Sequence, residues 1–257
     1  MARSFLIRGM ICGIVAGLLV FLYARIFGEP NVDGAIGFEE QLAHLAGAIH
    51  EHEEEIVSRD VQASWGLFTG VMLYSIALGG LFSLLYAYCW GRMGKLGAEA
   101  SAAVLAGASF VAVYLVPFLK YPANPPSIGN PETIGTRTAL YFGMIVISIV
   151  AMVAAVGLGR ALVKRRGAWN AALAAGGVYL ALVAVAGVLM PAINEVPESF
   201  PAALLWSFRI TSLGMQLLLW TALGLAFGAL TQRGLAIGLT AGSRAVSAAP
   251  AAEANSR

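Results

Sequence analysis

Six long apolar stretches divide the 257-residue chain, and its charged residues fall mainly in the gaps between them. Each stretch is continuously apolar instead of alternating, which favours membrane-spanning helices over barrel strands. About 20 helical residues cross the hydrocarbon core of a bilayer. The predicted helices lie roughly at Gly9–Ala24, Trp65–Trp90, Ala100–Leu119, Thr138–Gly159, Ala168–Pro191 and Ile210–Gln232. The first is the shortest, and arginines at its two ends can snorkel to extend it.

Composition supports the same class of protein. Hydrophobic residues make up 59% of the chain and charged residues only 12%, whereas soluble domains average about 25% charged residues. We therefore expect an all-α, polytopic integral membrane helix bundle with about six transmembrane helices. Residues 1–240 would form a single membrane domain. Residues 241–257, rich in Ala and Ser, would form a disordered cytoplasmic tail.

The distribution of basic residues predicts the orientation of the bundle. Eleven of the 16 Lys and Arg residues fall on one side, together with only Glu99 and Glu253 of the 14 acidic residues. That side holds both termini and the cluster from Lys164 to Arg166, and the positive-inside rule makes it cytoplasmic. The first helix has the basic start of a signal peptide. No clear small-x-small cleavage site follows it, so a retained anchor is favoured.

Glycines recur at intervals of four residues inside two of the predicted helices. Gly9, Gly13 and Gly17 make two overlapping GxxxG steps, and Gly224 and Gly228 make another. Such faces let helix backbones approach closely. The pattern leaves two interpretations open, namely packing within one chain and association between copies.

The first extracytoplasmic loop, residues 27–64, is long and acidic. It contains all three histidines of the chain, and helical spacing would place carboxylates near them. Imidazole and carboxylate together suit divalent first-row metals such as Co²⁺, Ni²⁺ and Zn²⁺. The candidate capture site consists of His44, His50, His52, Glu51 and Glu54. A solvated acidic helix with incidental histidines is the alternative.

The loop over residues 117–137 is rich in proline. Five prolines and one glycine fall within residues 117–131, which fixes the backbone and disfavours helix. Rigid non-helical backbone at a membrane face is tolerated where it lines a cavity or is covered by protein. A stiff surface connector remains the alternative.

Three arginines, Arg59, Arg137 and Arg209, each precede a predicted helix that runs inward. A cation at that end opposes the helix dipole and lies on the side that the charge rule depletes of cations. Ion pairing with nearby acids, interfacial anchoring and direct substrate contact would each explain them. The acids considered as partners are Asp60, Glu132, Glu195, Glu198 and those of the first loop.

Several classes of function lack their motifs. The chain has no Walker A sequence, no His-Glu-x-x-His and no Gly-x-Ser-x-Gly. The helix interiors carry almost no ionisable groups, which disfavours an internal proton relay. We therefore expect no enzyme, no permanently bound cofactor and no nucleic-acid partner.

Four stretches in about the first 145 residues resemble the CbtA family of predicted cobalt transporter subunits. They are the acidic, histidine-bearing first loop, residues 57–62 leading into Gly66-Leu67, residues 119–131 and residues 133–141. The Lys-Tyr-Pro-x-Asn-Pro-Pro pattern is the most specific. The positions carried over as candidate entrance or motif residues are Arg59, Gln62, Lys120, Tyr121, Asn124, Asn130, Arg137 and Thr138.

The resemblance implies a multi-pass subunit of a divalent-metal uptake system in the cytoplasmic membrane, with cobalt as the substrate. It also implies a small one-helix partner of the CbtB type, and it leaves open whether the chain forms an oligomer. The alternative is a non-transporting scaffold or assembly subunit that docks a partner through its outer loops.

Overall fold

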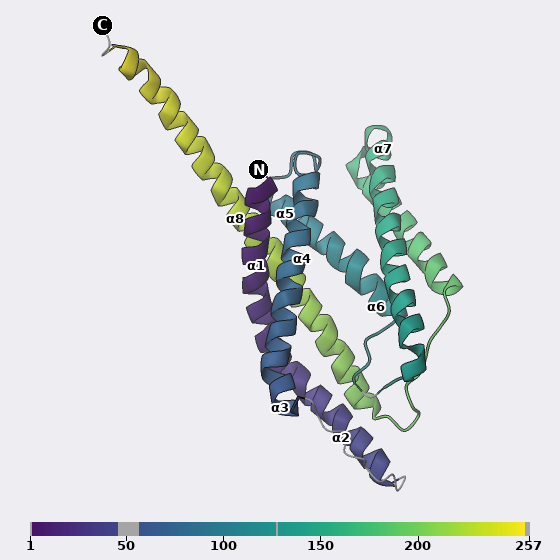
Figure 1. Cartoon of the computed structure of the whole chain (residues 1–257). Helices are drawn as coiled ribbons and strands as arrows, with labels where there is room; N and C mark the ends of the chain where they lie inside the picture. The colour runs from purple at the N-terminus through teal and green to yellow at the C-terminus, as the bar shows by residue number, and fades with distance from the viewer. Residues whose placement is uncertain (1, 46–56, 127, 255–257) are drawn as a thin grey trace. The chain divides into compact units, whose positions relative to one another are not determined.

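A computed structural model describes residues 2–45, 57–126 and 128–254, with side chains described up to residue 236. Every regular element in these ranges is a helix, which confirms the all-α prediction (Figure 1). Five helical stretches are long and apolar enough to cross a membrane by length and composition. They are Arg3–Leu45, Arg59–Cys89, Ala98–Lys120, Pro131–Leu189 and Ala202–Ala236.

Large apolar side chains lie on the outside of these helices. Leu73, Val153 and Leu180 are 66%, 68% and 65% exposed. Continuous apolar surface of this kind is rare on soluble monomers but is what a lipid-facing helix presents. The chain is therefore a multi-pass membrane protein.

The chain divides into two compact units. Unit 1 contains Met1–Leu19, Thr69–Gly107 and Leu218–Arg257, and unit 2 contains Val20–Phe68 and Ala108–Leu217. Unit 1 contains most of three helices, α1 (Ala2–Tyr23), α4 (Leu67–Cys89) and α5 (Ala98–Ser109). It also contains the second part of α8 (Ala202–Ala254). The backbone of α8 is helical to Ala254, and disorder after residue 240 stays a prediction.

In unit 1 the glycine faces are occupied by neighbouring helices of the same chain. A Cβ added at Gly13 would lie 2.5 Å from the carbonyl oxygen of Ser75 on α4. A Cβ at Gly228 would lie 2.9 Å from the Cα of Glu99 on α5. Only glycine permits this approach of backbones. Of the two interpretations left open by the sequence, these contacts match packing within one chain.

Unit 2 contains the acidic segment, and its structure corrects the expected boundaries. Helix α1 continues through a π-helical turn, η1 (Ala24–Gly28), into α2 (Glu29–Leu45). The segment expected as a loop from residue 27 is therefore helical up to Leu45. The chain resumes with α3 (Arg59–Val61) and a second π-helix, η2 (Gln62–Gly66).

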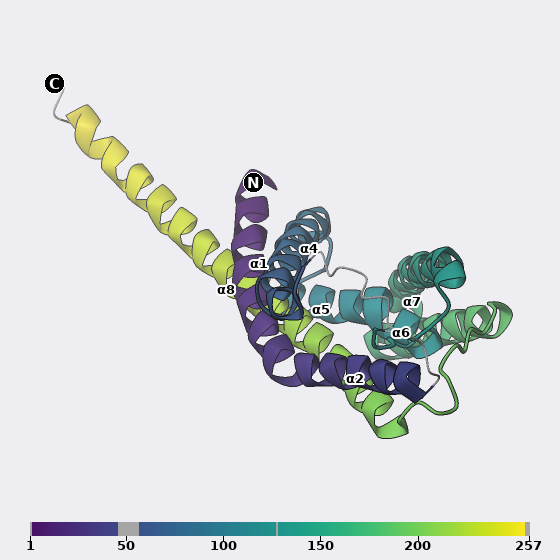
Figure 2. The same ribbon diagram turned by 60° about the horizontal axis from the view of Figure 1, so that its bottom comes forward.

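Helix α7 (Ile134–Leu189) is a helical hairpin within unit 2. Gly167 interrupts it with φ 75° and ψ 163°, a conformation that only glycine adopts without strain. The two arms run antiparallel (Figures 1 and 2). Contacts between them agree with this arrangement: the Ser148 and Tyr179 hydroxyls lie 2.8 Å apart, and Met144 packs in one cluster with Val183.

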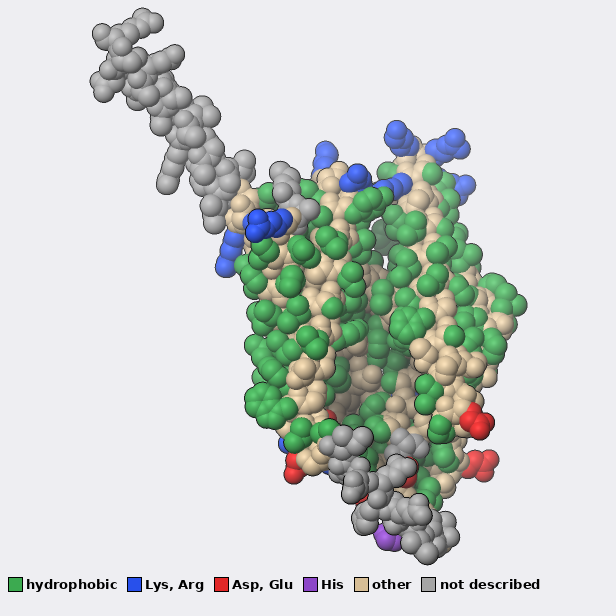
Figure 3. Space-filling model, viewed as in Figure 1, with side chains coloured by type: hydrophobic (Ala, Val, Ile, Leu, Met, Phe, Trp, Pro, Cys, Tyr) green, Lys and Arg blue, Asp and Glu red, His purple; other side chains and the backbone are tan. Residues whose placement is uncertain are grey.

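The surface of α7 is apolar between two charged ends. Basic side chains gather around the turn at Gly167, and acidic side chains lie at the opposite end of the hairpin (Figure 3). The band between them is covered by hydrophobic side chains. Charged ends around an apolar belt match a pair of arms that cross a bilayer.

At the candidate site, the helix predicted at Ala100–Leu119 is observed over Ala98–Lys120, whereas the predicted start of the last helix was wrong. Pro117 belongs to a helix, α6 (Val116–Lys120), and the preceding turn is a π-helix, η3 (Phe110–Leu115). Proline removes one helical hydrogen bond, and a π-turn accommodates such an irregularity. Among the described residues of the proline-rich loop, non-helical backbone is found at 121–126 and 128–130, ahead of the 3₁₀ turn η4 (Pro131–Thr133). Helix α8 begins at Ala202, so Arg209 lies about two turns inside it and not before its start.

Candidate functional site

The structure places one member of the predicted metal-capture site. His44 lies in the last turn of α2. His50, His52, Glu51 and Glu54 lie outside the described residues. Within the described ranges, no group of three or more His, Cys, Asp or Glu side chains is arranged to hold a metal ion. The capture site therefore stays a prediction.

Arg59 pairs with two carboxylates of α2. Its Nη2 donates to Glu29 Oε2 and, at 2.9 Å, to Asp33 Oδ1, while its Nε donates to Asp33 Oδ1 at 3.2 Å. Residues four apart lie on one helix face, so Glu29 and Asp33 face Arg59 together. Gln62 donates to the carbonyl of Val57 at 2.8 Å. Arg59 therefore links the start of the second apolar helical stretch to α2, while Gln62 bonds to the backbone just before that stretch.

Arg137 and Glu195 form the centre of a second polar cluster. Arg137 Nε lies 3.4 Å from Glu195 Oε2. Glu195 also accepts hydrogen bonds from the Asn130 N–H at 2.9 Å and the Thr133 hydroxyl at 2.6 Å. The hydrogen bond from Thr133 is the main reason that the pKa of Glu195 lies below its usual value, with further lowering by Asn130 and Arg137.

Gly129 makes room for this cluster. Its φ is +111°, and a Cβ there would clash with the Arg137 guanidinium and lie 2.8 Å from Glu195 Oε2. Glycine is needed for both reasons, since other residues disfavour that φ and bring a Cβ. The Arg137 Nη2 also donates to the carbonyl of Asn130 at 3.3 Å. The motif residues of this loop thus clamp it to residues 190–201.

Arg209 extends from α8 to the proline-rich segment. Its Nε donates to the carbonyl of Ala123 at 3.2 Å, and its Nη2 donates to Asn124 Oδ1 at 2.9 Å. These partners are neutral, and among the described residues no carboxylate pairs with Arg209. Ion pairing with an acid is thus observed for Arg59 and Arg137, while Arg209 has an amide and a carbonyl instead.

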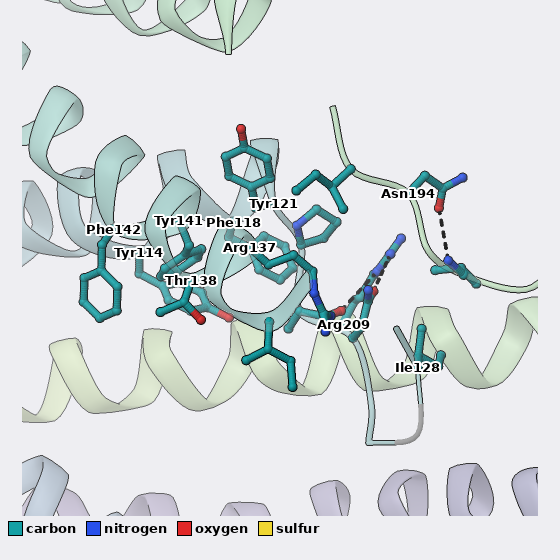
Figure 4. Close-up of a pocket in the computed structure, with 16 residues that line it drawn as sticks. Tyr114, Phe118, Tyr121, Ile128, Arg137, Thr138, Tyr141, Phe142, Asn194 and Arg209 are labelled. Atoms are coloured by element: carbon teal, nitrogen blue, oxygen red, sulfur yellow. Dashed lines mark hydrogen bonds between the residues drawn. The ribbon is translucent and has the colours of Figure 1, made fainter. Parts of the chain in front are cut away.

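Arg137 and Arg209 both line a cavity of about 500 Å³ within unit 2, here called the arginine cavity. Arg137 and Arg209 reach one end of it in the view of Figure 4, and Tyr114, Tyr141 and Phe142 lie at the other end. Within the described part of the chain, no acidic residue or histidine lines it. The proline-rich segment therefore lines a cavity, as one of its two interpretations required.

Four of the eight predicted motif residues line the arginine cavity: Tyr121, Asn124, Arg137 and Thr138. Asn130 does not line the cavity, but its N–H donates to Glu195, the partner of Arg137. The Lys120 Nζ lies 5.7 Å from the Tyr121 ring centroid. The Tyr121 hydroxyl donates to the carbonyl of Pro191 at 2.8 Å.

Three π-helices are features that sequence reasoning missed. All three fall in unit 2. Two of them, η1 and η3, lie beside polar side chains: Asn31 donates to Thr211 Oγ1 at 3.4 Å, and the Tyr114 and Ser212 hydroxyls lie 2.8 Å apart. Such π-turns occur frequently at functional sites. The available signal near η3 was the pair of polar residues Thr211 and Ser212 at the start of an apolar stretch.

Comparison with known proteins identifies one family. A family model described as "Probable cobalt transporter subunit (CbtA)" matches residues 2–232. The match extends the resemblance, which rested on about the first 145 residues, across all five apolar helical stretches. No curated protein and no solved structure matches the chain.

Proposed function

The chain belongs to the CbtA family of probable cobalt transporter subunits, and from this membership we propose that it is the membrane-embedded subunit of a cobalt uptake system in the cytoplasmic membrane. The observation that carries the proposal is the family match over residues 2–232. A transporter subunit is not an enzyme class. Its substrate would be divalent cobalt, which passes through the protein instead of residing in it.

We propose a topology of six crossings with both termini in the cytoplasm. The stretch Pro131–Leu189 has 59 residues, far more than the roughly 20 that one crossing needs. Gly167 divides it into two antiparallel arms, each long enough to cross. Basic residues 164–166 at the turn favour a cytoplasmic position under the positive-inside rule. The acidic segment then faces outside.

The captured ion would first meet the acidic segment. His44, His50, His52, Glu51 and Glu54 supply imidazole and carboxylate groups, a ligand set suited to Co²⁺. The membrane potential would favour inward passage of a divalent ion by about 4.6 kcal/mol per 100 mV, twice the value for one charge. The arginine cavity is unsuited to a bare cation, since two guanidiniums line it and repel positive charge.

Metal capture can be measured on the purified full-length chain by calorimetry with Co²⁺. The variant in which His44, His50 and His52 are all changed to Ala should lose most of the binding heat. Acidification should weaken binding to the unmodified protein, because protonated imidazole cannot ligate a metal. Unchanged binding by the triple variant would contradict the capture site and support the alternative, a solvated acidic helix with incidental histidines.

A second candidate function is a non-transporting scaffold or assembly subunit that docks a partner through its outer loops. Uptake of radioactive cobalt by cells expressing this chain, with and without a one-helix partner of the CbtB type, separates the two functions. A transporter subunit raises uptake, whereas a scaffold that only binds the partner leaves it at the background rate.

A further inference from the structure

The arginine cavity has the size of a ligand site. Its volume of about 500 Å³ lies within the range of roughly 300–1,000 Å³ that is typical of small-molecule pockets. Such pockets combine apolar walls with a few polar groups that fix the ligand's orientation. Here the apolar walls come from η3, α6 and α7, and the polar groups are the two arginines with Asn124, Asn194 and Thr138.

The two guanidiniums differ in how their charge is balanced. Arg137 is paired with Glu195, which in turn accepts two further hydrogen bonds. Arg209 donates only to neutral oxygens, those of Ala123 and Asn124. Since no acidic residue among the described ones lines the cavity, its polar end carries one unbalanced positive charge.

Arg209 also has donors to spare. A guanidinium carries five N–H donors in a planar fork, and Arg209 uses two of them. Its two hydrogen bonds to Ala123 and Asn124 of the proline-rich segment hold the guanidinium in place. A pre-positioned guanidinium with free donors suits a carboxylate, which can accept two parallel hydrogen bonds.

The other end of the cavity is aromatic. Tyr114 and Phe118, one helical turn apart, are stacked with ring centroids 5.4 Å apart and an interplanar angle of 25°. Tyr141 and Phe142 from α7 complete this end (Figure 4). These rings offer apolar area to the body of a ligand whose charged group lies at the arginines.

We propose that the arginine cavity binds an organic monocarboxylate, whose carboxylate pairs with Arg209 and whose apolar or aromatic body lies among Tyr114, Phe118 and Tyr141. One negative charge balances the one unbalanced positive charge. The site goes beyond the proposed cobalt transport, because a bare cation is excluded from it and its ligand is an anion.

The test uses the full-length chain in nanodiscs of a zwitterionic lipid, so that no anionic lipid competes. Calorimetry compares 2-naphthoate with 2-naphthamide, which has the same ring system without the charge. We expect saturable binding of the acid at least tenfold tighter than that of the amide. Equal affinities would overturn the proposal, because both compounds would then be partitioning through their rings alone.

Arg209→Gln should weaken 2-naphthoate binding about tenfold or more, the loss expected for about 1.4 kcal/mol or more. The matched control is Arg25→Gln, which removes an exposed charge of unit 2 that does not line the cavity. Arg25→Gln should leave binding unchanged. Equal losses in both variants would show a general charge effect and contradict the site.

Arg209→Lys keeps the charge but not the planar fork, and should retain part of the affinity. If Arg209→Gln fails to fold, two measurements still test the proposal. They are the affinities of 2-naphthoate and 2-naphthamide for the unmodified chain, and the affinity of 2-naphthoate for the Arg209→Lys variant. Added Co²⁺ should not change 2-naphthoate affinity. Competition between the two would contradict the exclusion of cations from the cavity, and failure of cobalt uptake would leave the carboxylate result standing.

Discussion

Arg137 in the first turn of α7 and Glu195 in the segment before α8 form an ion pair, with 3.4 Å between Nε and Oε2. The pair joins two parts of the chain that are 58 positions apart, and Gly129 gives it room beside the proline-rich segment. Their side chains are only 27% and 18% exposed. An ion pair shielded to this degree depends on both partners, since loss of one strands the other.

Arg137→Gln should therefore lower the folded yield in detergent and reduce the apparent Tm by about 2–4 °C, the size expected for about 1 kcal/mol in a chain of this length. Thermal unfolding followed by circular dichroism measures the change. Arg165→Gln, which changes an exposed arginine on the same helix, is the control. If the two variants melted alike, the pair would be no more than an exposed contact.

The pair also predicts a dependence on pH. The pKa of Glu195 is lowered in the folded chain, mainly by the hydrogen bond from Thr133. In the unfolded chain the carboxyl has the usual value of about 4.3, so the folded state binds fewer protons. The stabilisation is fully present above about pH 4.3 and is lost as the pH falls towards the lowered folded value. Glu195→Gln should thus lose less Tm between pH 5 and pH 3 than the unmodified chain, and parallel curves would contradict this.

The glycine face of α1 predicts a sharp contrast between two identical substitutions. Gly13→Ala places a Cβ 2.5 Å from a backbone oxygen of α4 and should cost about 1–3 kcal/mol. Gly176→Ala meets nothing within 4 Å and should be neutral or stabilising, because alanine favours helix. Apparent Tm of the two variants provides the comparison. A Gly13→Ala variant as stable as Gly176→Ala would show that α1 and α4 pack less closely than described.

The proposed topology predicts opposite labelling of two cysteines. In a background of Cys12→Ser and Cys89→Ser, the Glu53→Cys and Arg165→Cys variants would report on the acidic segment and on the turn of α7. An impermeant maleimide should label the first variant in intact cells and the second only after the membrane is opened. Labelling of Arg165→Cys but not of Glu53→Cys in intact cells would show that the proposed topology is reversed.

Hydropathy was sufficient to predict the helical class and the approximate spans, because burial in lipid demands long apolar runs. It failed at boundaries that depend on neighbours. Arg209 looked like the edge of a helix, yet α8 starts at Ala202, and the guanidinium is tolerated inside it because Asn124 and Ala123 accept its hydrogen bonds. Pro117 lies inside the helix predicted at Ala100–Leu119, and the π-turn before it keeps that helix continuous to Lys120.

The candidate site shows the same limit. The proline pattern marked residues 119–131 as unusual, and four of the motif residues do line a cavity. Which arginine pairs with which acid could not be deduced, since Arg137 meets Glu195 and Arg59 meets Glu29 and Asp33 only through the fold. The cavity itself arises from residues of several helices, and no local pattern encodes it.

The most direct test of the account is the initial rate of radioactive cobalt uptake in cells that express the full chain together with a one-helix CbtB-type partner. Cells expressing the partner alone provide the baseline, and the variant with His44, His50 and His52 changed to Ala provides the matched control. We predict saturable uptake above the baseline for the unmodified chain and a marked loss in the triple variant. Uptake by the unmodified chain no faster than with the partner alone would contradict its assignment as a cobalt uptake subunit.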